Sequence, residues 1–81
     1  MPRYFFHIHD GISLPDDEGT ILNDLEAARL EAILLTSALL RENSKDFWNG
    51  HEWKLDVADE HGLTLFTLMF IALDAPVLQK P

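Results

Sequence analysis

Two histidines, His7 and His9, are the residues of this chain whose type and spacing best suit a chemical role. They lie two apart in the opening segment 3–9, and alternate residues of a β-strand project from the same face. Together with Asp56, on the outward side of an expected neighbouring strand, they would offer ligands suited to zinc, nickel or copper. The favoured interpretation is that they are structural residues of a half-exposed sheet face, because their spacing secures no third ligand. Both interpretations stay open.

Other chemistries find little support. The acidic loop Pro15–Gly19 lacks the alternating carboxylates and the closing glutamate of an EF-hand calcium loop, so we expect a solvated turn. There is no cysteine and no serine in a nucleophile elbow, and the four glycines are dispersed among turns. We therefore expect a protein that is not an enzyme and that uses no cofactor.

The histidine pair would be carried by the first strand of a small sheet. Segment 3–9 alternates between an apolar face and a mixed face, and Asp10-Gly11 after it is a strong turn signal. Segment 12–14 is expected to form a short strand. Segment 20–22 is expected to pair briefly with the first strand.

A long helix is predicted from Leu25 to about Asn43, with Asn23 or Asp24 as its N-cap. Its core face is a stripe at helical spacing, formed by Leu25, Ala28, Ala32, Leu35, Thr36 and Leu39. Apolar residues continue around the helix, so a second apolar surface is expected at Leu30, Ile33, Leu34 and Leu40.

After a predicted turn at Asn49-Gly50, the chain is expected to form a hairpin of segments 52–59 and 63–70. A two-residue loop at His61-Gly62 would set its register, with Gly62 at positive φ. The resulting pairs are Val57 with Phe66, Leu55 with Leu68, and Trp53 with Phe70. This register directs the large aromatic side chains of the hairpin towards the helix.

The predicted fold is an α+β two-layer sandwich. Its antiparallel sheet has three main strands plus one short strand, a long helix covers one face, and the order is β-β-α-β-β. Residues 1–73 form a single domain, and the tail 74–81, which holds two prolines, is expected to lie loosely on the surface. The outward sheet face is left with three large apolar side chains, those of Phe5, Leu65 and Met69. This face is expected to be exposed to solvent, covered by segment 71–78, or used for contact.

Composition limits the classes of partner. The 81 residues include six Lys and Arg, scattered along the chain, against fourteen Asp and Glu, for a formal net charge of −8. Nucleic acids and anionic membranes both attract clustered basic residues, so neither is expected as a partner. No signal peptide or membrane span is evident, which favours the cytoplasm. A chain this small has a marginal core, and association with a second copy would supplement it.

Residues 1–70 resemble a family of short, uncharacterised alphaproteobacterial proteins that consist of a domain of unknown function. The opening MPRYFFHIHDG carries most of the resemblance, followed by Asp17-Glu18-Gly19 and by segment 24–29. Segments 53–59, with Gly62, and 68–70 match more loosely. The resemblance implies a small cytoplasmic bacterial protein and brings no established activity or catalytic residues. The helix of this chain is richer in leucine than is usual in the family.

Three functional hypotheses follow. The first is a non-enzymatic protein-interaction module that forms a homodimer through the second helix surface or the outward sheet face. The second is a metal-binding protein that uses His7 and His9. The third is an acidic, antitoxin-like neutraliser of a basic partner protein, since the layout is loosely similar to HicB-type antitoxins.

Overall fold

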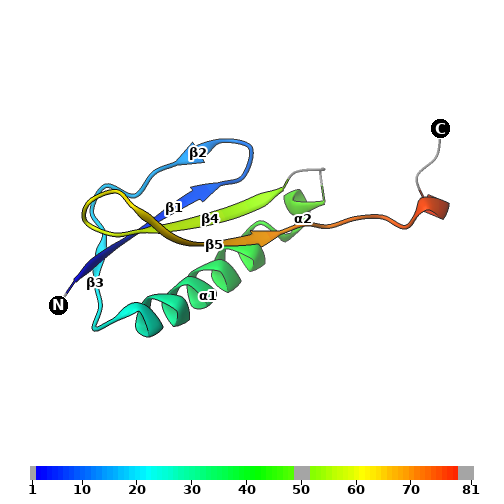
Figure 1. Cartoon of the computed structure of the whole chain (residues 1–81). Helices are drawn as coiled ribbons and strands as arrows, with labels where there is room; N and C mark the ends of the chain where they lie inside the picture. Colours follow the sequence, from blue (N-terminus) through cyan, green and yellow to red (C-terminus); the bar gives the residue numbers. More distant parts are fainter. Residues whose placement is uncertain (1, 49–51, 79–81) are drawn as a thin grey trace.

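A sheet and a long helix make up two layers (Figure 1), which a computed structural model describes over residues 2–48 and 52–78. In chain order the elements are β1 (Arg3–His9), β2 (Ser13–Leu14), β3 (Thr20–Ile21), α1 (Leu25–Glu42), α2 (Ser44–Phe47), β4 (Trp53–Ala58), β5 (Thr64–Phe70) and the 3₁₀ turn η1 (Pro76–Leu78). The predicted α+β two-layer class is confirmed. The predicted turn at Asn49-Gly50 lies outside the described residues.

All strand pairs of the sheet are antiparallel, in the order β2-β1-β4-β5, with β3 also paired to β1. β1 and β4 are therefore the central strands, and β2 and β3 meet different ends of the outer edge of β1. The helix α1 lies along one face of this sheet (Figure 1). The predicted pairing of segment 20–22 with the first strand is confirmed, and because segment 12–14 pairs with that strand as well, the sheet has two short strands.

The helix begins at a side-chain cap and uses small residues to approach the sheet. Oδ1 of Asp24 accepts a hydrogen bond from the amide of Ala27 at 2.9 Å, which satisfies one of the free N–H groups of the first turn. Ala28, Ala32 and Thr36 are buried on the face that meets the sheet. Leu35 and Leu39 of the predicted core stripe are partly buried beside them. Leu25, at the end of the stripe, is exposed, because it lies in the first turn at the rim of the layer.

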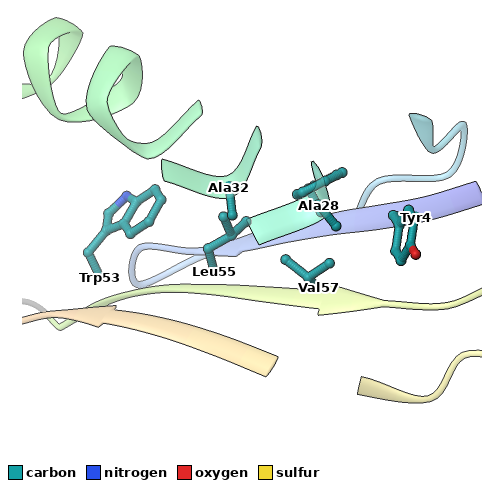
Figure 2. Packing of buried hydrophobic residues seen from close by; sticks show 7 residues of the cluster. Tyr4, Ala28, Ala32, Trp53, Leu55 and Val57 are labelled. Carbon is teal, nitrogen blue, oxygen red and sulfur yellow. The ribbon is translucent and has the colours of Figure 1, made fainter. Parts of the chain in front are cut away.

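The core lies between α1 and the central strands. Leu55 and Val57 of β4 are fully buried, and Figure 2 shows them beneath Ala28 and Ala32. Trp53 closes one end of the core, where its ring meets that of Phe70 edge to face with centroids 5.9 Å apart. At the other end the core is completed by two buried aromatic side chains of β1, Tyr4 and Phe6.

The hairpin has the predicted register but a different loop. Val57 pairs with Phe66, Leu55 with Leu68, and Trp53 with Phe70, as the apolar alternation predicts. Ala58 then pairs with Thr64, which leaves Leu65 as the extra residue of a β-bulge. The two-residue loop is therefore wrong: the amide of Asp59 donates to the carbonyl of Leu63, closing a three-residue turn. The bulge absorbs the difference in length, so the core-facing pairs keep their positions.

The C-terminal segment does not lie on the surface as expected. Residues 71–78, called the arm below, continue from β5 and extend away from the two layers (Figure 1, orange to red). The arm ends in η1, where the amide of Leu78 donates to the carbonyl of Ala75. Residues 74–78 are exposed and follow the direction of β5 instead of lying on the two layers.

Candidate functional site

The sheet face opposite α1, called the open face below, carries the three residues predicted as metal ligands, His7, His9 and Asp56. Strand pairing aligns His7, Asp56 and Thr67 across β1, β4 and β5. The hydroxyl of Thr67 donates to Oδ1 of Asp56 at 2.6 Å, and Nε2 of His9 lies 3.1 Å from Oδ2 of the same carboxylate. Asp56 is therefore held between side chains from both neighbouring strands.

His7 is engaged elsewhere. Its Nδ1 accepts a hydrogen bond from the amide of Asp16 at 3.0 Å, and its ring stacks with that of Phe5 at a centroid distance of 6.4 Å. A ring nitrogen that accepts an amide proton cannot offer the same lone pair to a metal. Of the three predicted metal ligands, the structure thus brings His9 and Asp56 into contact, while His7 is tied to the acidic loop.

No metal centre is evident from this arrangement. Within residues 2–48 and 52–78, no group of three or more histidine, cysteine, aspartate or glutamate side chains is positioned to hold a metal ion. The contact between His9 and Asp56 is instead a partly exposed ion pair when His9 is protonated. Such pairs on a protein surface contribute roughly 0–1 kcal/mol to stability.

Asp16 organises the acidic loop, a role that the sequence interpretation missed. Its Oδ1 accepts the amides of Glu18 and Gly19, both at 3.0 Å, and its Oδ2 accepts the amide of Phe6 at 3.1 Å. The last of these bonds falls between the two short strands, where β1 has no strand partner on that side. The loop is therefore anchored to the sheet. An aspartate directly after a proline, three residues before a glycine, was the available signal.

These bonds change the acidity of Asp16. Partial burial raises the pKa of its carboxyl. The hydrogen bonds from the amides of Gly19, Phe6 and Glu18, together with the nearby His7, lower that pKa by more than burial raises it. The net result is a pKa below the ordinary value of 3.8. The pKa of Asp59 is also lowered, chiefly because its carboxylate accepts the amide of Leu63 in the hairpin turn.

The predicted interface residues fall into two separate places. On the back of α1, Leu30 and Leu34 are 62% and 57% exposed, with Ile33 exposed beside them and Leu40 half-buried. On the open face, the side chains that were expected to be bare are those of Phe5, Leu65 and Met69. Met69 and Leu65 are exposed, whereas the ring of Phe5 lies half-buried next to Gly19.

The arm adds apolar residues that the sequence interpretation left out of the interface. Leu73 and Val77 are 80% and 82% exposed, and Ile71 and Leu78 are exposed as well. The available signal was the alternation of Met69, Ile71 and Leu73, which continues the period of β5 past its last hydrogen-bonded residue. The prolines that follow favour a loose tail, and for that reason the sequence interpretation did not count these residues as part of an interface.

Comparison with known proteins places the chain among uncharacterised domains. No helix in the described part of the chain has the length and apolar character that crossing a bilayer requires. No curated protein and no solved structure matches the chain. One family model does match, over residues 3–71, which covers all strands and α1, and its description is "Domain of unknown function (DUF6894)". The chain thus belongs to the DUF6894 family, and the expected membership of an uncharacterised family is confirmed.

Proposed function

We propose that this protein is a non-enzymatic interaction module whose working form is a homodimer. One observation carries the proposal: the chain exposes more surface than a compact folded monomer of its mass. Its accessible surface is 6092 Å², whereas a folded monomer of 9.2 kDa exposes about 4,900 Å². The difference of about 1,200 Å² exceeds the roughly 800 Å² that each partner buries in a standard interface.

The character of this surface supports the proposal. The helix back contributes Leu30, Ile33 and Leu34, which are neighbours at helical spacing. The open face contributes Met69, and the arm contributes Leu73 and further exposed apolar residues. Single exposed apolar residues are ordinary, but groups of them on one ridge or one strand mark interfaces. A second copy of the chain would cover these apolar surfaces, and neither a basic protein nor a nucleic acid would be needed as a partner.

Size-exclusion chromatography with light scattering tests the proposal. At tens of micromolar, the wild-type chain is expected to elute with twice its chain mass of 9.2 kDa. Dilution should shift the mass towards that of the monomer, because association follows mass action. A mass of one chain across the concentration range would contradict the proposal.

The two other hypotheses remain predictions. Metal binding has lost one of its ligands to the amide of Asp16, and titration calorimetry with zinc, nickel and copper tests it directly. Equal heats from the wild type and from a His7→Ala/His9→Ala variant would remove it. The antitoxin-like role rests on the net charge of −8 and on the loose similarity of the layout to HicB-type antitoxins, and co-purification of a basic protein from the native host tests it.

A further inference from the structure

The two edges of the sheet are finished differently. The outer edge of β1 pairs with β3 at one end and β2 at the other, and Asp16 accepts the amide of Phe6 in the gap between them. The opposite edge is β5, which in the described part of the chain pairs only with β4. One edge is thus closed by the chain itself, and the other presents its backbone N–H and C=O groups.

Nothing in the sequence of β5 protects that edge. Thr64–Phe70 reads TLFTLMF, with no charge, proline or glycine, over seven residues. Soluble proteins usually guard a free edge with lysine, proline, a very short strand or a covering loop, because bare strands pair with other chains. The bulge at Leu65 disturbs one end only, and segment 66–70 stays regular.

The arm extends this edge beyond the body of the protein. The radius of gyration is 14.7 Å and the molecule measures 52 × 19 × 19 Å, whereas a compact chain of this length has a radius of gyration of about 12 Å. The arm lies in line with β5 and projects past the end of α1 (Figure 1). Ile71 and Leu73 are exposed, although an apolar segment gains from burial. A partner strand beside the edge would cover them.

We propose that two copies pair antiparallel through the outer edges of β5, with each arm lying along β5 of the other copy. This inference rests on the proposed homodimer and specifies its interface. A two-fold axis perpendicular to the sheet joins the two sheets into one and keeps both α1 helices on the same face. The pairing ends near Pro76, which lacks the N–H needed to continue a ladder.

The alternation along β5 and the arm limits the register. Residues directly opposite in an antiparallel pair lie on the same face, so the two residue numbers must both be odd or both be even. With the axis at Met69, this residue faces its own copy, and Ile71 faces Thr67 of the partner subunit. Leu73 then reaches Leu65 of the partner subunit. The exposed apolar residues of the arm thereby lie beside those of the open face, and no two like charges stand opposite each other.

Cysteine crosslinking tests the interface with little background, because the natural chain has no cysteine. A Met69→Cys variant should form a covalent dimer on mild oxidation, or with a short bismaleimide, since opposed side chains across a two-fold axis lie within reach of each other. Leu14→Cys is the matched control: Leu14 and Met69 are both 51% exposed, but Leu14 lies in β2 at the far edge. It should remain largely monomeric on a non-reducing gel.

A mixing experiment tests the register. Ile71→Cys and Thr67→Cys chains should each crosslink poorly alone and crosslink efficiently when mixed, because only unlike chains place the two thiols opposite each other. Failure of the mixed pair would overturn the register.

The outcome also separates this inference from the function on which it rests. A dimeric mass in solution, with the Met69→Cys variant crosslinking no better than the Leu14→Cys variant, would overturn edge pairing and leave self-association standing. A monomeric mass for the wild type would overturn both.

Discussion

Asp16 makes the connection that holds the acidic loop against the sheet, with three backbone amides donating to one carboxylate. Asp16→Asn keeps the size of the side chain but replaces one carboxylate oxygen with an NH2 group. That group would place a donor against a backbone N–H, which is also a donor. We expect the free energy of unfolding to fall by about 1–2 kcal/mol, after allowance for partial exposure. Asp17→Asn, at an exposed neighbour, should change it little. Urea denaturation of the three proteins measures the difference.

The same residue gives stability a dependence on pH. Because the pKa of Asp16 is lowered in the folded protein, its contribution is present above its unfolded pKa of about 3.9. The contribution is lost as the pH falls through the folded pKa. The wild type should therefore lose more stability than Asp16→Asn between pH 5 and pH 3. Parallel loss in the two proteins would contradict the assignment.

Gly19 and Gly62 form a matched pair for testing close packing over the open face. Both have positive φ, 74° and 82°, so alanine at either site costs about 1–2 kcal/mol in backbone strain. A Cβ at Gly19 would also lie 2.7 Å from Cγ of Arg3 and 2.9 Å from the ring of Phe5, while one at Gly62 would meet nothing within 4 Å. Thermal unfolding should show Gly19→Ala to be destabilised more, by about a further 1–3 kcal/mol. Equal losses would mean that the loop moves away freely.

Two threonines should respond in opposite directions to the same change. Thr36 is buried in the helix–sheet interface and its hydroxyl has no hydrogen-bond partner, so Thr36→Val should raise the free energy of unfolding by about 1 kcal/mol. Thr67→Val removes the bond to Asp56 and should lower it by a few tenths of a kcal/mol to about 1 kcal/mol. Chemical denaturation compares both with the wild type. A loss of stability in Thr36→Val would indicate an unseen partner for the hydroxyl.

At the scale of elements, the parts of the fold predicted from sequence are those governed by short-range periodicity. The alternation of Trp53, Leu55 and Val57 with polar residues determined the hairpin register, because a one-residue slip would turn the whole apolar set outward. The turn was predicted less well. It holds one residue more than predicted, and the bulge at Leu65 compensates for that residue, so the core-facing pairs do not move. The contact between Asp16 and the amide of Phe6 spans ten residues and has no periodic signature.

The candidate apolar surfaces were only partly predicted, because periodicity assigns residues to a face of an element but does not place that element in space. Helical spacing was enough to place Leu30 and Leu34 away from the core stripe. Whether an exposed segment folds back or extends depends on space beside the sheet, which local sequence does not encode. The sequence therefore favours a loose tail where the structure has the arm, although Ile71 and Leu73 continue the alternation of β5.

Two sets of variants distinguish the helix back from the strand edge as the contact. If β5 and the arm carry the dimer, Leu30→Glu/Leu34→Glu should remain dimeric, because these residues lie on α1, away from the edge. Leu73→Asp, in the exposed arm, should weaken the dimer at least tenfold in dissociation constant, since it places a charge against an apolar partner surface. Analytical ultracentrifugation measures both. A monomeric helix double variant beside a dimeric Leu73→Asp chain would assign the contact to α1 instead.

At the scale of the whole molecule, dimerisation brings together two copies that each carry a formal net charge of −8. Segment 63–76, over which the two chains are proposed to pair, has one charged residue, Asp74, and no basic residue, so the paired segments form no ion pair with each other. The remaining electrostatic effect is long-range repulsion, which salt screens because the Debye length falls from about 30 Å at 0.01 M to about 10 Å at 0.1 M. The dissociation constant should therefore fall as sodium chloride is raised from about 0.01 to about 0.3 M, and sedimentation at several concentrations measures it. A dimer that dissociates on adding salt would instead require ion pairs across the interface, which two copies of segment 63–76 cannot supply because the segment has no basic residue.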